Sequence, residues 1–224
     1  ETSFGLGFSG NEMIGKFVAG NDFNYVQAHA TSIAASGKYN ISSCSSEVIA
    51  SGRVQMKNYQ AVDLINGLER HDGYTHAFFK TFTPALQNRI RQYASQGGRI
   101  LISGSYTGSD MQTEEEQAFL SDILKLSYEP TGSTAITRDI NPEDSTVTER
   151  DSIVYTSPNV KGLGLQFSYY NELNAQHYAA THPEILKPVG NYAFTAMQYD
   201  TGTSAAVAYK STTYRSFVMG FPLE

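Results

Sequence analysis

The sequence has a single cysteine, Cys44, and no tryptophan. One cysteine excludes an internal disulfide framework and a cysteine-based metal site. Lysine and arginine form no cluster, and the net charge of −6 is opposite in sign to that of a nucleic-acid-binding surface. No apolar run approaches the roughly 18 residues that a membrane-spanning helix needs. We therefore expect no nucleic-acid partner, no membrane span, and neither a metal nor another cofactor.

The length and composition suit one domain. The chain has 224 residues, of which 40% are hydrophobic, so it can bury a sizeable core. Its first residues, ETSFGLGFSG, do not begin with methionine and do not follow the basic–apolar–small pattern of a signal peptide. No linker, internal repeat or low-complexity segment is visible. We interpret residues 1–224 as a single domain, cut from a longer protein.

The first half of the chain alternates helix and strand signals. Thr83 and Pro84 are typical of a helix start, and Thr113 with Glu116 forms a capping box. Runs such as RILIS read as buried strands. Helices are predicted at 22–36, 45–52, 83–97 and 113–124, and strands at 38–44, 61–65 and 99–103.

The second half reads differently. Residues 127–190 are mostly irregular by pattern, and then YAFTAMQY, SAAVAYK and RSFVMGF alternate like strands joined by tight turns. The alternation of the first half is typical of a parallel sheet covered on both faces. The prediction is an α/β fold: a three-layer sandwich with a mostly parallel sheet, closed by an antiparallel C-terminal meander of strands.

The stretch GGRILISGSYTGSDM, residues 97–111, resembles a nucleophile elbow. Small residues flank Ser105, and the turn follows a buried strand and precedes a helix, as an elbow requires. Ser105 is therefore a candidate nucleophile, and the N–H groups of the helix after Asp110 could bind an anion. The alternative is a plain strand-to-helix turn with Asp110 or Thr113 as the helix cap.

Other polar residues are candidates near the same sheet edge, where ligands collect in open parallel sheets. His182-Pro183-Glu184 offers a base and an orienting carboxylate, and His29 offers another base. Glu69, Tyr106, Asp110 and His29 are candidate binding residues. The rings of Tyr106, Tyr169 and Tyr170 are candidates for contact with sugar faces. Asp63 lies inside a predicted buried strand, so it needs a partner or a place at the sheet edge.

Three weaker motifs are better explained as loops. Gly5-Leu6-Gly7-Phe8-Ser9-Gly10 spells a dinucleotide motif, but nothing strand-like precedes it. The acidic run at 139–144 has no glycine at the sixth position of a calcium loop. His177 and His182 are five residues apart, which is wrong for one helical face, so no zinc site is expected.

Several long segments of the sequence resemble those of one protein family: AGNDFNYVQAHATSIAASG, SCSSEVIASGRV, YQAVDLINGLER, FKTFTPALQNRIRQYASQGGRILISGSYTGSDM and YRSFVMGFPLE. They are similar to large secreted bacterial proteins of the xanthan lyase-like type, in a region that is a class I glutamine amidotransferase-like, flavodoxin-type domain. Such amidotransferases carry a cysteine at the elbow and a His-x-Glu segment. Here the resemblance implies that Ser105 stands in place of the cysteine and that His182 and Glu184 are the histidine and glutamate of the His-x-Glu segment.

The resemblance implies a secreted or periplasmic location, with the signal peptide outside this chain, and the absence of the usual first strand before residue 21. Nothing here resembles the helical toroid of a xanthan-class lyase, so the lyase activity itself does not transfer. The expectation is a non-catalytic amidotransferase-like domain, structural or binding polysaccharide or other domains of the same polypeptide. The alternative is a serine hydrolase that uses Ser105.

Overall fold

The computed structural model describes residues 25–70, 80–132, 134–140, 147–172 and 179–223. Its helices fall close to the expected positions: Tyr25–Ala35 (α2), Ser46–Ala50 (α3), Pro84–Ser95 (α4) and Glu114–Phe119 (α5), with a 3-10 turn at Met56–Asn58 (η1) and a π-helical turn at Leu120–Leu124 (η2). Residues 1–20, where the usual first strand is expected to be absent, and the glycine motif at 5–10 lie outside the described residues, as do His177 and most of the acidic run.

Local capping explains where the helices begin and end. The Thr83 side chain accepts a hydrogen bond from the Leu86 N–H at the start of α4, where Pro84 takes the first helical position. At α5 both halves of the Thr113–Glu116 capping box are formed, as predicted. η2 ends at Lys125, whose backbone is left-handed with φ +60°.

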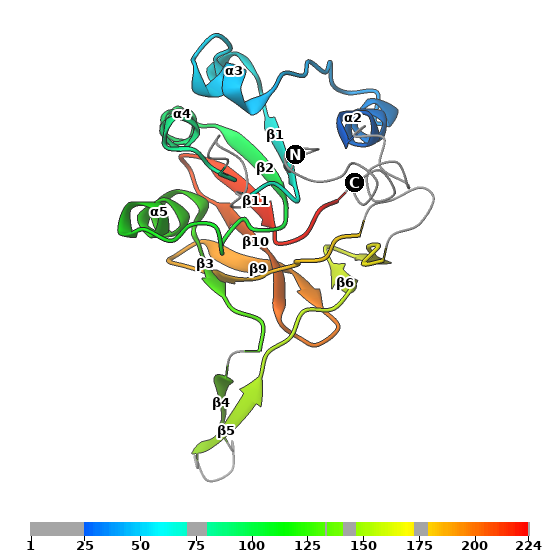
Figure 1. Cartoon of the computed structure of the whole chain (residues 1–224), viewed down its shortest axis with the longest axis vertical. Helices are drawn as coiled ribbons and strands as arrows, with labels where there is room; N and C mark the ends of the chain where they lie inside the picture. The colour runs from blue at the N-terminus through cyan, green and yellow to red at the C-terminus, as the bar shows by residue number, and fades with distance from the viewer. Residues whose placement is uncertain (1–24, 71–79, 133, 141–146, 173–178, 224) are drawn as a thin grey trace, which may run out of the picture.

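The strands form one large sheet and two small ones. The bounds are Val62–Gly67 (β1), Arg99–Gly104 (β2), Leu126–Glu129 (β3), Thr134–Ile140 (β4), Val147–Ile153 (β5), Asn159–Gly162 (β6), Leu165–Ser168 (β7), Ile185–Pro188 (β8), Ala193–Tyr199 (β9), Ser204–Lys210 (β10) and Arg215–Met219 (β11). The seven-stranded sheet has the order β1-β2-β11-β10-β9-β6-β7. β3 pairs with β8, and the β4–β5 hairpin projects away from the rest of the molecule (Figure 1).

The predicted mostly parallel, flavodoxin-like sheet is wrong. Only the β1–β2 and β2–β11 pairs of the large sheet are parallel, and the pairs β11–β10, β10–β9, β9–β6 and β6–β7 are antiparallel. The physical reason lies in the second half of the chain, where no described helix separates the strands and successive strands turn back on one another. Residues 127–190, expected to be mostly irregular, supply β6 and β7 of this sheet.

Two hydrophobic clusters cover the two faces of the sheet, because neighbouring residues of a strand point to opposite faces. Ile100 and Ile102 of β2 face a cluster built with α3, α4 and α5, while Leu101 faces the other cluster. Figure 1 shows α3, α4 and α5 gathered on one side of the sheet. Among the described residues no helical side chain belongs to the second cluster, and α2 meets this other face of β1 through His29, which pairs with Asp63.

The predicted strand at 38–44 does not form. These residues follow α2 as an irregular segment. Its two large apolar side chains, Tyr39 and Ile41, are 56% and 41% exposed. A strand needs a neighbouring strand and burial of at least one face, and among the described residues this segment has neither.

Candidate functional site

The turn after β2 is fixed by close backbone contacts. Gly104 has φ +148°, and a Cβ there would lie 2.7 Å from the Asn66 Cβ. The Gly104 N–H donates to the Phe221 carbonyl at 3.0 Å, and the Ser105 N–H donates to the Gly67 carbonyl at 2.8 Å. The end of β2 is therefore held on one side by the end of β1 and on the other by the segment after β11.

This geometry places Tyr106, and not Ser105, at the tip of the turn. Tyr106 has a left-handed backbone with φ +60°, which is the strained conformation that an elbow gives to its functional side chain. Ser105 has 0% exposure, and its Oγ is without a hydrogen-bond partner among the described residues. No imidazole of the described part lies within hydrogen-bond reach of the candidate nucleophile.

Glu184 is the buried anchor of the turn. Its carboxylate, in a residue that is 3% exposed, accepts hydrogen bonds from the Gly108 N–H at 2.6 Å, the Ser109 N–H at 3.0 Å and the Ser109 hydroxyl at 2.5 Å. The Glu184 N–H donates to the Gly220 carbonyl at 2.6 Å, which ties this segment to the chain after β11. Burial raises the pKa of Glu184, and the hydrogen bonds from Ser109 and Gly108 oppose that rise.

The Tyr106 ring is contacted by two exposed planar groups. The Arg70 guanidinium carbon lies 4.5 Å from the ring centroid, and the His182 ring centroid lies 4.9 Å away at an interplanar angle of 33°. Partial burial lowers the pKa of His182 from its ordinary value, and the positive charge of Arg70 lowers it further, so both favour the neutral imidazole. Burial raises the pKa of the Tyr106 hydroxyl. We call Arg70, Tyr106 and His182 the tyrosine cluster.

Thr81 connects the ends of β1 and β2. Its hydroxyl donates to the Glu69 carbonyl at 2.9 Å, and its N–H donates to Asp110 Oδ2 at 2.9 Å. Asp110 is thus held by the backbone of Thr81, and burial raises its pKa against that hydrogen bond. The candidate binding residues Glu69, Tyr106 and Asp110 accordingly lie in one neighbourhood.

The helix N-terminus considered as an anion site is filled by the protein itself. The N–H groups of Gln112 and Thr113 donate to Glu116 Oε2 at 2.7 and 3.0 Å. The other carboxylate oxygen of Glu116 accepts from the Lys80 ammonium at 2.5 Å. A ligand anion at this position would have to displace Glu116.

His29 lies apart from the turn and pairs with Asp63. The distance from His29 Nδ1 to Asp63 Oδ2 is 2.7 Å, and His29 is 7% exposed. This pair joins α2 to β1 and gives Asp63 the partner that its place in a strand requires.

The structure thus brings together Ser105, His182, Glu184, Glu69, Tyr106 and Asp110, and it leaves His29 elsewhere. Sequence reasoning missed Arg70, Thr81 and Ser109. Arg70 follows Glu69 in a plain loop, and no motif marks Thr81 or Ser109 as partners of distant groups. Within the described residues no group of three or more His, Cys, Asp or Glu side chains could hold a metal ion. No helix in this part of the chain is long and apolar enough to cross a membrane.

Comparisons with known proteins add little. No family model matches the chain, and no curated protein matches it. Among solved structures, the exo-beta-1,4-mannosidase Op5Man5 from Opitutaceae bacterium strain TAV5 is 10% identical, with a TM-score of 0.38 over 75% of this chain and 21% of that chain. A polyextremophilic beta-galactosidase from the Antarctic haloarchaeon Halorubrum lacusprofundi is 16% identical, with a TM-score of 0.42 over 76% of this chain and 20% of that chain. The chain spans about a fifth of each, and we base no argument on likeness this low.

Proposed function

We propose that this chain is a non-catalytic domain of a secreted protein that handles polysaccharide, and that it binds glycan at the tyrosine cluster. The observation that carries the proposal is the state of the turn. Ser105 is buried without a hydrogen-bond partner among the described residues, and a tyrosine with a raised pKa stands at the tip. A phenol held in its neutral form is a weak nucleophile.

The exposed groups around the tip suit sugar binding. Arg70 and His182 are exposed and planar, and both offer N–H donors. Tyr170, which is 54% exposed, is held beside the segment that leads to His182, because its carbonyl accepts a hydrogen bond from the Ala180 N–H at 2.8 Å. Aromatic faces and flat donors are the groups that contact the C–H faces and hydroxyls of a sugar. The resemblance of the sequence to xanthan lyase-like proteins points the same way.

Binding to a glycan array, followed by calorimetry on each hit, tests the proposal. Arg70→Ala, His182→Ala and Tyr170→Ala are each expected to weaken a hit at least ten-fold. Tyr39→Ala is the matched control, since Tyr39 is equally exposed at 56% but lies in the segment after α2. The proposal fails if no glycan binds, or if the three variants bind as tightly as the control.

The serine hydrolase alternative requires Ser105 to become exposed and to meet a base. His182 and Glu184 lie near the turn, which suits this alternative, but both side chains have other partners. Glu184 is already engaged by Gly108 and Ser109, and the His182 Nδ1 lies 2.8 Å from the Thr181 hydroxyl. Labelling by a fluorophosphonate that disappears in Ser105→Ala would support this alternative over ours.

A further inference from the structure

A polar trough runs along α4 at the opposite end of the parallel strands from the tyrosine cluster. Two hollows of about 240 and 290 Å³ share Lys57, Tyr93 and Gln96 in their walls. The second hollow is bordered by Gln60 and Arg99, which stand at the amino ends of β1 and β2. We call the two hollows together the α4 trough; each is slightly smaller than the volumes of about 300–1,000 Å³ typical of ligand sites.

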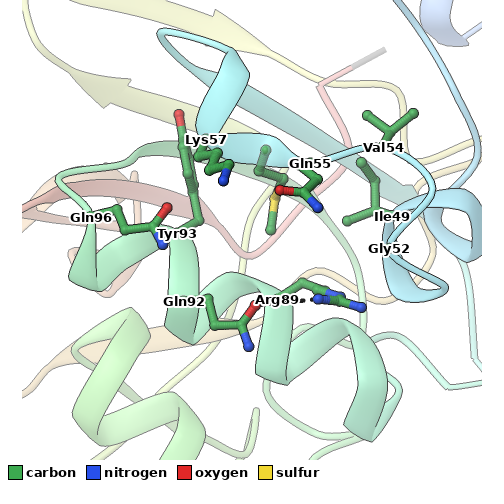
Figure 2. Close-up of a pocket in the computed structure, with 10 residues that line it drawn as sticks. Ile49, Gly52, Val54, Gln55, Lys57, Arg89, Gln92, Tyr93 and Gln96 are labelled. Atoms are coloured by element: carbon green, nitrogen blue, oxygen red, sulfur yellow. Dashed lines mark hydrogen bonds between the residues drawn. The ribbon is translucent and has the colours of Figure 1, made fainter.

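The trough has a firm framework. Tyr93 is 4% exposed, and its hydroxyl donates to the Tyr59 carbonyl at 3.1 Å. Gly98 leaves room for the Tyr93 ring, because a Cβ there would lie 2.5 Å from Tyr93 Cδ1. Arg89 Nη1 donates to Gln92 Oε1 at 3.3 Å and its Nε donates to the Ala50 carbonyl at 3.5 Å, so the guanidinium is held between α4 and the end of α3. Figure 2 shows Arg89, Gln92, Tyr93 and Gln96 on α4, with Lys57 on the facing segment.

The charged side chains that line the two hollows are all positive. The walls carry four side-chain amides, three cations and two phenol rings: Gln55, Gln60, Gln92, Gln96, Lys57, Arg89, Arg99, Tyr59 and Tyr93. No aspartate or glutamate lines either hollow among the described residues, although the whole chain has a net charge of −6. Cations gathered without counter-charges create a local positive potential that attracts anions.

Each kind of group matches one part of an acidic sugar chain. An amide offers both donors and an acceptor, so it can bind neighbouring hydroxyls. The ring of Tyr59, which is 41% exposed, offers an apolar face, and Arg89 and Lys57 offer charge-assisted hydrogen bonds to a carboxylate. We propose that the α4 trough is a binding site for an oligosaccharide that carries carboxylate groups, separate from the tyrosine cluster.

Calorimetry on the intact chain at low salt tests this proposal. The acidic probes are α-1,4-linked trigalacturonate, β-1,4-linked trimannuronate and a hyaluronan tetrasaccharide; maltotriose and triglutamate are the neutral-sugar and acidic-peptide comparators. At least one acidic sugar is expected to bind ten-fold or more tightly than both comparators, and its binding is expected to weaken as salt screens the charges.

Variants locate the site. Arg89→Gln and Lys57→Gln are each expected to weaken that binding at least ten-fold, while Lys38→Gln, an exposed lysine just after α2, leaves it unchanged. Lys57 is exposed, so Lys57→Gln keeps the test valid if Arg89→Gln does not fold. Failure of all three acidic sugars to bind overturns the proposal, as does equal binding of maltotriose or triglutamate. Unchanged affinity in Lys57→Gln also overturns it. Because Arg70→Ala acts only at the tyrosine cluster, either site can fail without the other.

Discussion

Replacing Glu184 by alanine removes the acceptor that holds the turn after β2. Three donors lose their partner: the N–H of Gly108, the N–H of Ser109 and the Ser109 hydroxyl. Gly108 is buried, so its N–H cannot turn to water, whereas Ser109 is half-buried and can recover part of its hydrogen bonding. We expect the loss to fall mainly on the Gly108 N–H.

The magnitude follows from these partners. A buried donor left unsatisfied costs about 1–3 kcal/mol, and a hydrogen bond to a charged group contributes about 1.5–3 kcal/mol. Against this, the variant no longer buries an ionised carboxylate, whose pKa burial has raised. The net expected loss in unfolding free energy is about 3 kcal/mol, which corresponds to a fall in Tm of about 6–12 °C for a chain of this size.

The isosteric variant Glu184→Gln separates charge from shape. Its amide keeps one acceptor oxygen, so the loss is expected to be smaller, about 1–2 kcal/mol. Glu184→Gln also removes the pH dependence of stability that comes from the Glu184 carboxyl group. Because the folded pKa of Glu184 is raised above 4.5, its contribution to stability is present below the unfolded pKa and is lost as pH rises through the folded pKa. The difference in stability between wild type and Glu184→Gln therefore shrinks as pH rises through that window.

Urea unfolding followed by circular dichroism, at pH values from acid to neutral, measures both effects. Glu172→Ala is the control, since Glu172 is exposed and its removal should change stability by less than about 0.5 kcal/mol. A loss below about 1 kcal/mol in Glu184→Ala would refute the anchoring of the turn. A constant difference between wild type and Glu184→Gln across pH would refute the assignment of the raised pKa.

Three further variants test other contacts by the same unfolding assay. Ser105→Ala removes a buried hydroxyl that has no partner among the described residues, so stability should stay unchanged or rise by up to about 1 kcal/mol; a clear loss would reveal a hidden partner. Asp63→Asn weakens the 2.7 Å contact with His29 and should lower stability by about 1–3 kcal/mol, and no change would contradict the pair. Gly108→Ala places a Cβ 2.6 Å from the Tyr128 Cβ, so a loss of about 1–3 kcal/mol is expected, whereas unchanged stability would contradict the close packing of this turn against β3.

The sequence was most informative where structure is local. The helix start at Thr83 and the capping box of Thr113 and Glu116 were predicted because each depends on residues that are close together in the sequence. β6 and β7 were missed because strands of four residues are too short to show a clear alternation. Strand direction was also mispredicted, since it depends on which distant strands pair.

The candidate site shows the same division. His182 and Glu184 were predicted to work with the turn, and the structure places both beside it. The tip was assigned one residue too early. Which residue takes the left-handed backbone depends on how Gly104 approaches Asn66, a contact between two strands that sequence does not show.

The place of β11 in the sheet has a consequence for how the protein forms during synthesis. β11 is the sole link between the parallel pair β1–β2 and the antiparallel strands β10, β9, β6 and β7 of the large sheet in the described structure. The ribosome makes every other strand of this sheet before residues 215–219. Until residues 215–219 emerge, the β1–β2 pair and the antiparallel strands each keep an unpaired edge. Pairing of β11 with β2 is slow because the two strands are far apart in the sequence. A ribosome that stalls before residue 215 would therefore leave a nascent chain with unpaired strand edges, which favour aggregation.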